Sequence, residues 1–140
     1  IRVGLGKFMP SYYKKLANQG TISLFTTPYT HPILPLLLDM NNAKYANPNT
    51  KIPSNYISMK DDVIKHIEKA QNIYQNSFGT QTKGLWPAEG AVDEESLRLY
   101  YEKGIKYIAT DEAILHKSGE MNHHRVYKKI QFKEIVSCSY

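Results

Sequence analysis

Apolar residues between positions 58 and 79 recur at the three- or four-residue spacing of an amphipathic helix. The stripe consists of Val63, Ile67, Ala70, Tyr74 and Phe78. Ser58 and Asp61 have the spacing of a capping box, and Gly79 suits the end of a helix because glycine readily takes a left-handed conformation. We therefore expect a helix here that packs one face on a core.

Two further helices are predicted from the residues at their ends. Residues 10–18 read as the end of a helix, with Pro10 suited to a first turn, where a missing N–H costs little, and Gly20 just beyond the end. Residues 93–103 read as a helix opened by Asp93, with two glutamates in its positive first turn. Residues 27–40 read as a loop that turns into a short helix.

Segments rich in β-branched and aromatic residues alternate with these helices. Residues 21–27 and 83–86 each have strand character and stop at a proline, and residues 105–110 form a third candidate strand. Residues 126–140 alternate less regularly and predict one more strand, whereas residues 41–57 are rich in Asn and Pro and predict a surface excursion. Strands separated by helices favour an α/β fold with parallel strands and crossover helices, open or closed into a barrel.

Composition is that of one globular domain. The chain has 140 residues, of which 41% are hydrophobic and 22% charged. Its longest apolar run, residues 33–38, is short and contains Pro35, so we expect no membrane span and no membrane partner. Residues 1–15 contain neither an initiator Met nor a signal pattern, and we expect the chain to be cut from a longer protein.

Charge and cysteine content bear on a nucleic-acid partner and on disulfide formation. The net charge of +5 comes from 18 basic and 13 acidic residues, and the only dense basic cluster is residues 123–129. Scattered lysines favour a solvated surface over a nucleic-acid partner. Cys138 is the single cysteine, so no internal disulfide can form, and a reduced, inert thiol in a cytoplasmic protein is expected.

Polar and aromatic side chains follow three of the predicted strands. These residues are His31 after the first, Trp86 and Glu89 after the second, and Asp111 and Glu112 after the third. Because the carboxyl ends of parallel strands meet at one edge, and function in such folds gathers there, we expect these side chains to lie close together. Each also has a simpler interpretation: a solvated turn glutamate, a histidine near a helix start, and acids that open a helix.

The pair Trp86 and Glu89 fits carbohydrate chemistry. Aromatic faces pack on sugar rings, and carboxylates attack or protonate glycosidic bonds. Glycoside hydrolysis generally needs two carboxyl groups, at about 5–5.5 Å for retention or roughly 6.5–9.5 Å for inversion. Glu89 alone therefore cannot complete the reaction.

Metal and phosphate sites are the competing chemistries. His123 and His124 are adjacent and point in different directions on regular backbone, and no spacing typical of a zinc site occurs. A metal site would have to combine His31, Asp111 and a distant histidine. The GLGK segment at residues 4–7 is too short for a phosphate loop and reads as a turn.

Three ordered segments resemble glycoside hydrolase family 57, the α-amylase- and amylopullulanase-like enzymes. TTPYTHPILPLL at residues 26–37 is similar to the family's TTPxxHPILPLL signature. GLWPAEGAV at residues 84–92 is similar to its nucleophile region, and ATDEAIL at residues 109–115 to the strand and loop that follow. The resemblance covers most of residues 10–115.

The resemblance implies part of a distorted (β/α)7 barrel and a retaining mechanism that uses no metal and no cofactor. By motif, Glu89 would be the nucleophile and Trp86 a platform for a sugar ring. His31 would hydrogen-bond substrate hydroxyls, and Asp111 and Glu112 would lie near the same pocket.

The chain also departs from the family's pattern. The His-Gln-Pro segment near the start of the barrel is absent, and the general acid/base aspartate has only a faint counterpart in Phe132-Lys133-Glu134. Glu134 is the weak candidate within the chain, and we expect the true acid/base to lie outside it or to be missing. A related eight-stranded barrel needs about 250 residues, so 140 residues cannot close one.

The sequence thus predicts a segment of a retaining hydrolase or transglycosylase that acts on starch- or glycogen-like α-glucans. Its partners would be the glucan and the remainder of the parent catalytic chain, and the isolated segment should be inactive. Two alternatives stay open. One is a non-catalytic relative that binds glucan, and the other is a metal-dependent polysaccharide deacetylase.

Overall fold

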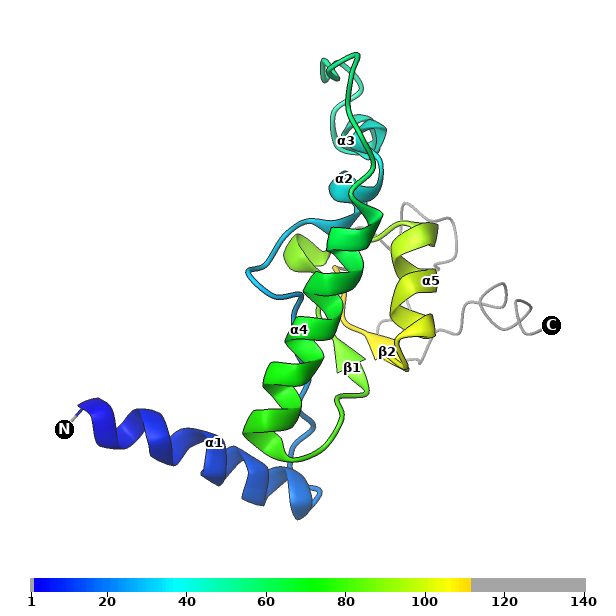
Figure 1. Cartoon of the computed structure of the whole chain (residues 1–140). Helices are drawn as coiled ribbons and strands as arrows, with labels where there is room; N and C mark the ends of the chain where they lie inside the picture. The colour runs from blue at the N-terminus through cyan, green and yellow to red at the C-terminus, as the bar shows by residue number, and fades with distance from the viewer. Residues whose placement is uncertain (1, 112–140) are drawn as a thin grey trace.

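The computed structural model describes residues 2–111 (Figure 1). The helical elements are α1 (Arg2–Asn18), α2 (Leu34–Leu38), the 3-10 turn η1 (Met40–Asn42), α3 (Ala43–Ala46), α4 (Lys60–Phe78), the 3-10 turn η2 (Ala88–Gly90) and α5 (Glu94–Glu102). The strands are β1 (Gly84–Leu85) and β2 (Tyr107–Ile108). Within the described part of the chain, no helix is long and apolar enough to cross a membrane.

The centre of the fold is a small parallel sheet. On β1, Leu85 pairs with Ile108 of β2 on one side and forms a parallel bridge with Thr26 on the other. Three extended segments therefore run in the same direction with β1 in the middle. The chain returns through α4 between the first two segments and through α5 between the last two.

Parallel strands with crossover helices were predicted, and this arrangement is confirmed. The strand predicted over residues 21–27 was wrong in its length, because only Thr26 of that segment pairs with β1. Strand β1 is itself only two residues long, so among residues 2–111 the rest of the segment has no strand to pair with. The described residues form no barrel, consistent with a fragment of an α/β domain, and the strand predicted over residues 126–140 lies outside them.

Helices α4 and α5 cover the same face of the sheet and enclose the core. Leu85 of β1 is fully buried, and Ile108 of β2 packs against the same cluster, so the helix-facing side of the sheet is apolar. The core consists of Leu34, Leu38, Val63, Ile67, Leu85, Leu99, Tyr100 and Ile105. The stripe predicted for α4 is confirmed, except that Phe78 is only half-buried.

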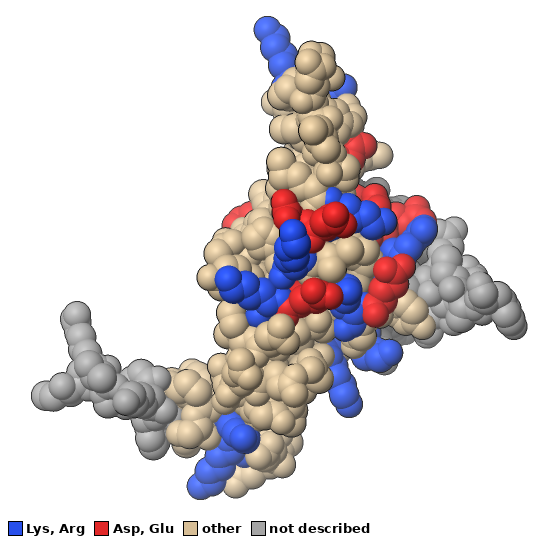
Figure 2. Space-filling model, viewed as in Figure 1, with Lys and Arg blue, Asp and Glu red and all other residues tan. Residues whose placement is uncertain are grey.

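The outer sides of α4 and α5 carry mixed charge (Figure 2). Lys60 Nζ of α4 lies 2.9 Å from Glu95 Oε1 of α5, and Lys103 Nζ lies 2.7 Å from Glu68 Oε1. Half-exposed pairs of this kind contribute little to stability. Alternating signs fit the solvated face predicted from the scattered lysines.

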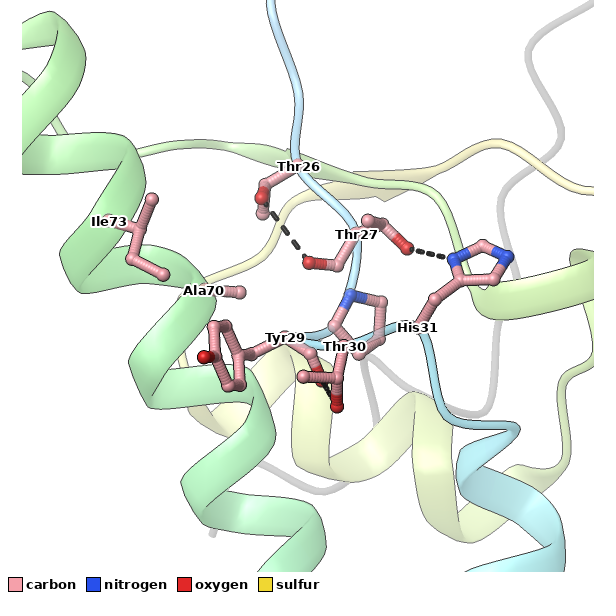
Figure 3. A pocket seen from close by; sticks show the side chains of 8 residues that line it. Thr26, Thr27, Tyr29, Thr30, His31, Ala70 and Ile73 are labelled. Atoms are coloured by element: carbon pink, nitrogen blue, oxygen red, sulfur yellow. Dashed lines mark hydrogen bonds between the residues drawn. The ribbon is translucent and has the colours of Figure 1, made fainter.

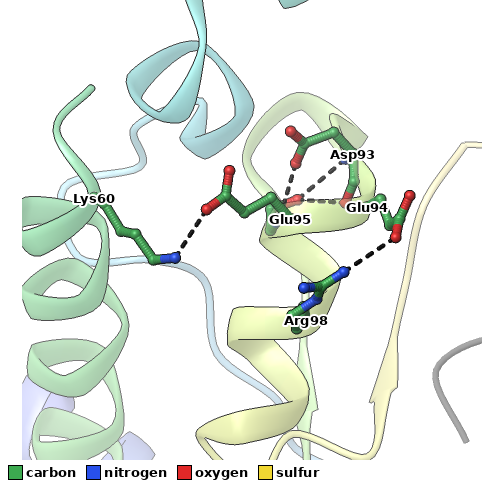
Figure 4. Close-up of polar contacts among 6 residues, drawn as sticks. Lys60, Asp93, Glu94, Glu95 and Arg98 are labelled. Carbon is green, nitrogen blue, oxygen red and sulfur yellow. Dashed lines mark hydrogen bonds and ion pairs between the residues drawn. The ribbon is translucent and has the colours of Figure 1, made fainter. Parts of the chain in front are cut away.

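The predicted ends of α5 and α4 have different outcomes. Asp93 caps α5 as predicted, since its carboxylate accepts the Ser96 N–H at 2.9 Å while Ser96 Oγ accepts the Asp93 N–H at 3.1 Å (Figure 4). The capping box predicted at Ser58 was wrong, because α4 begins one residue after Met59 without a side-chain cap. The Met59 N–H donates instead to Leu37 O at 2.8 Å, a tertiary contact that local spacing does not reveal.

Residues 10–18 form the end of helix α1, as predicted. The helix starts at Arg2, so Pro10 lies in its interior rather than in a first turn, and the turn predicted for residues 4–7 was wrong. Pro10 has no N–H to donate to the carbonyl four residues earlier, which is why a helix start was the expected place for it. Gly20 follows the helix with a positive φ of 71°, in agreement with the predicted stop.

Residues 40–57 project from the body as a prong (Figure 1), which confirms the predicted surface excursion. A polar cluster joins its two ends: Tyr56 donates its hydroxyl to Asp39 Oδ1 at 2.6 Å, and the Asn41 N–H donates to the same oxygen at 2.8 Å. The Tyr56 hydrogen bond is the main cause that holds the pKa of Asp39 below its ordinary value.

Candidate active site

The three extended segments end at one edge of the sheet, as the sequence predicted. The Trp86 N–H donates to Thr26 O at 2.7 Å, and the Ala109 N–H donates to Leu85 O at 3.1 Å, so the segments stay aligned up to their last residues. The chain then leaves the first two segments in turns at this edge. Side chains from three distant parts of the sequence therefore share one rim.

Glu89 stands on a fixed turn at this rim. It lies in η2 with φ 55° and ψ 20°, the left-handed region that glutamate seldom adopts. Its neighbours Ala88 and Gly90 are buried, and Gly90 O accepts the Thr110 hydroxyl at 2.6 Å. The backbone is thus anchored on both sides, while the Glu89 side chain is 70% exposed. The carboxylate projects from a rigid support into solvent.

His31 comes from the turn after the first segment. Its Nδ1 lies 3.0 Å from Thr27 Oγ1, and its Nε2 lies 3.4 Å from Glu89 Oε1. Both Thr30 and His31 have a φ of 62°, and the His31 N–H donates to Pro28 O at 2.9 Å. Left-handed backbone costs about 1–2 kcal/mol at a non-glycine residue. Such strain persists only where the surroundings enforce it, and it clusters at functional sites.

Trp86 completes the group with an aromatic surface. Its ring meets the His31 ring edge to face, with centroids 6.0 Å apart and an interplanar angle of 73°. The Trp86 side chain is half-exposed although its backbone is held in the sheet. An exposed indole next to a carboxylate and an imidazole is suited to packing against a sugar ring.

Of the other predicted acids, the structure describes only Asp111. Asp111 is exposed and follows Thr110, whose hydroxyl is bonded to the Glu89 turn, so its backbone lies at the same rim. Glu112 and Glu134 lie outside the described residues. Of the predicted site residues, the structure therefore brings together His31, Trp86 and Glu89.

No group of three or more metal-binding side chains occurs within residues 2–111. His31 and Glu89 approach each other, but a zinc site needs at least three protein ligands. His123, His124 and Cys138 lie outside the described residues.

A hollow lies behind the rim, between the turn at residues 26–31 and α4 (Figure 3). Ala70 and Ile73 of α4 form its wall, and Tyr29 lies against the same helix. The Tyr29 N–H donates to His66 O at 3.1 Å, and His66 Nδ1 lies 2.8 Å from Tyr29 O. These two contacts fasten the His31 turn to α4 and so help to fix the direction in which His31 points.

Sequence reasoning missed two residues that support the site. Thr27 contacts the His31 ring, and Thr110 holds the turn of Glu89. The signals in the sequence are their places in the family-like segments 26–37 and 109–115 and at the ends of the first and third predicted strands. Threonines are common at strand ends, so position alone did not single them out.

Comparisons with known proteins bear on the family of the chain. The family model described as Glycosyl hydrolase family 57 matches residues 6–135. Alpha-amylase 1 of Dictyoglomus thermophilum is 27% identical to the chain over 112 residues, which is 78% of this chain and 13% of that protein. The chain thus spans a small part of the length of this curated relative. No solved structure gives a significant match.

Proposed function

Because the chain belongs to glycosyl hydrolase family 57, we propose that it supplies the nucleophile side of a retaining active site that hydrolyses or transfers α-glucans. The observation that carries the proposal is the Glu89 carboxylate, which is exposed on an anchored turn beside His31 and Trp86. The name of the relative, an α-amylase, supports a starch-like substrate. The proposal includes a (β/α)7 barrel that other residues of the parent protein would complete.

The reaction would proceed in two displacements. In the first, a Glu89 oxygen attacks the anomeric carbon and forms a glycosyl ester. The bond from that carbon to the leaving oxygen breaks, and a second carboxylic acid gives its proton to the leaving sugar. In the second, the resulting carboxylate takes a proton from water or from an acceptor sugar, whose oxygen displaces Glu89. The two inversions restore the α configuration.

Each predicted site residue would have its own role in this scheme. Trp86 would bind the sugar ring through its exposed face, and His31 would donate a hydrogen bond to a substrate hydroxyl or to the nucleophile. Asp111 and Glu112 would line the same pocket. The second carboxyl group would come from beyond residue 111, with Glu134 as the weak candidate within the chain.

The test is Glu89→Gln in the whole natural protein, assayed on amylose and glycogen. The amide keeps the shape of the side chain but cannot form the glycosyl ester, so kcat should fall by at least about a thousandfold. Glucan binding, measured by affinity electrophoresis in glycogen gels, should change little. Glu94→Gln is the matched control, because Glu94 is exposed on α5 and pairs only with Arg98 among the described residues.

Three results would contradict the proposal. Turnover by Glu89→Gln equal to that of the natural protein would exclude Glu89 as the nucleophile. Glucan binding without turnover by the natural protein would favour the non-catalytic alternative. Release of acetate that a chelator abolishes would favour a metal-dependent deacetylase.

A further inference from the structure

Thr27, His31 and Glu89 form a continuous polar chain across the rim. Thr27 Oγ1 lies 3.0 Å from His31 Nδ1, and the opposite ring nitrogen lies 3.4 Å from Glu89 Oε1. Figure 3 shows the Thr27 hydroxyl directed at the His31 ring. The imidazole therefore has a different polar partner at each nitrogen.

The chemistry of these partners restricts where the imidazole proton can lie. A neutral imidazole carries one N–H and one acceptor nitrogen, an ionised carboxylate only accepts, and a threonine hydroxyl can donate or accept. If Nδ1 carried the proton, the Nε2 lone pair would face the Glu89 oxygen, and the two would repel. If Nε2 carries it, Nε2–H is attracted to the carboxylate, and Nδ1 is left to accept the Thr27 hydroxyl proton. Of the two neutral forms, only the second satisfies both contacts.

The backbone around Thr27 fixes this geometry. Thr27 directly follows the bridge at Thr26 that ties the segment to β1, and the His31 turn is fastened to α4 through Tyr29 and His66. The hydroxyl and the ring are thus placed by two different anchors. The Nε2 to Oε1 distance of 3.4 Å is longer than an ordinary hydrogen bond, and such contacts in ligand-free sites often tighten when substrate binds.

We propose that Thr27 is a positioning residue, which holds His31 in the Nε2–H form by donating its hydroxyl proton to Nδ1 and thereby aims Nε2–H at the Glu89 carboxylate. This inference rests on the proposed function in one respect only, namely that Glu89 is the nucleophile. The contact would orient one Glu89 oxygen toward His31 and leave the other for attack. Neither the Glu89 nor the His31 assignment required a role for Thr27.

The first arm of the test reads the ring directly. Nitrogen-15 NMR of the full chain at pH about 8.5, above the ordinary histidine range, should give for His31 a protonated Nε2 and a non-protonated Nδ1 that accepts a hydrogen bond. Thr27→Val removes the hydroxyl while keeping the branched shape, so the Nδ1 resonance should move downfield. Thr27→Ser should restore it. The control is Thr26→Val, because the Thr26 hydroxyl contacts only Thr27 O in the described structure.

The second arm reads catalysis in the whole natural protein. Thr27→Val should lower kcat on amylose about three- to tenfold, the effect of one hydrogen bond, with KM changed by less than about twofold because substrate binding is not altered. Thr27→Ser should recover most of the loss, and Thr26→Val should match the natural protein. A loss that serine does not recover would indicate damage to the fold and overturn the inference.

The two arms also separate this inference from the proposed function. An Nδ1 resonance of His31 that is the same with and without the Thr27 hydroxyl overturns the inference, as does a protonated Nδ1. The expected NMR change with an unaltered kcat likewise overturns the positioning role. Full turnover by Glu89→Gln overturns the proposed function instead, and the NMR arm then still reports whether Thr27 sets the proton on His31.

Discussion

Replacing Gly84 should test how closely the Tyr107 ring packs against strand β1. A β-carbon at this position would overlap the Cε2 and Cζ atoms of the Tyr107 ring and lie 2.6 Å from its hydroxyl oxygen. Gly84 and Tyr107 are register partners on β1 and β2, so the ring lies across the neighbouring strand. We expect Gly84→Ala to destabilise the protein by forcing this ring away.

The size of the effect follows from two opposing contributions. Overpacking of this kind costs about 1–3 kcal/mol, while alanine in a strand is favoured over glycine by roughly 0.5–1 kcal/mol. Tyr107 is 43% exposed and can swing outward, which limits the penalty. The net loss should be about 1–2 kcal/mol. In a Tyr107→Ala background the clash is absent, so the same substitution should stabilise by about 0.5 kcal/mol.

Urea unfolding of the four members of this double-mutant cycle, followed by circular dichroism, gives the coupling free energy, which we expect to be about 2 kcal/mol. Gly104→Ala is the control. Gly104 has a φ of 80° but nothing within 4 Å of a β-carbon, so its cost is conformational and should be the same in both backgrounds. A coupling below about 0.5 kcal/mol between Gly84 and Tyr107 would refute the packing.

Two further predictions concern helix α5 and the prong. Asp93→Ala should lower the free energy of unfolding by about 1–2 kcal/mol through loss of the Ser96 cap, whereas Asp93→Ser should keep most of it, and urea unfolding of both variants decides the matter. Tyr56→Phe removes the largest cause of the lowered pKa of Asp39, so carbon-13 titration should find that pKa returned toward its ordinary value of 3.8. A lowered pKa gives stability that is present above pH 3.8 and is lost as pH falls through the folded-state pKa. Tyr56→Phe should therefore also reduce the dependence of stability on acid pH. An unchanged titration of Asp39 would contradict the role of the Tyr56 hydrogen bond.

Helices could be predicted where the information is local. The α4 stripe and the Asp93 cap depend on residues three or four positions apart, and both are found. The start of α4 could not be predicted, because a hydrogen bond from Met59 to the distant Leu37 determines it. Pro10 misled for a related reason, since a favourable site for proline is a preference rather than a requirement.

Strands were predicted less well than helices because pairing is not a local property. The β-branched residues of 21–27 indicate an extended segment, but only Thr26 finds a partner on β1. The direction of the strands was nevertheless correct, and direction alone determines which ends meet. For this reason His31, Trp86 and Glu89 could be placed at one rim from the sequence.

The detailed geometry of the site could not be predicted from the sequence. Threonine and glutamate seldom adopt a left-handed backbone, yet Thr30 and Glu89 do, as does His31. These conformations are enforced by contacts from elsewhere, including the Thr110 hydroxyl at the Glu89 turn. Likewise, the contact of Thr27 with His31 depends on how the chain turns after Thr26.

A nucleophilic Glu89 must form a covalent bond to the sugar, and mass spectrometry can detect that bond. The whole natural protein would be mixed with an activated α-maltosyl fluoride, quenched in acid and digested with trypsin. Trypsin cleaves after Lys83 and after Arg98, so it releases residues 84–98 as one peptide. This peptide should gain the mass of the donor sugar, and fragmentation should place the sugar on Glu89 rather than on Asp93, Glu94 or Glu95. Turnover with the sugar on another peptide, or with inverted products and no labelled peptide, would contradict this role of Glu89.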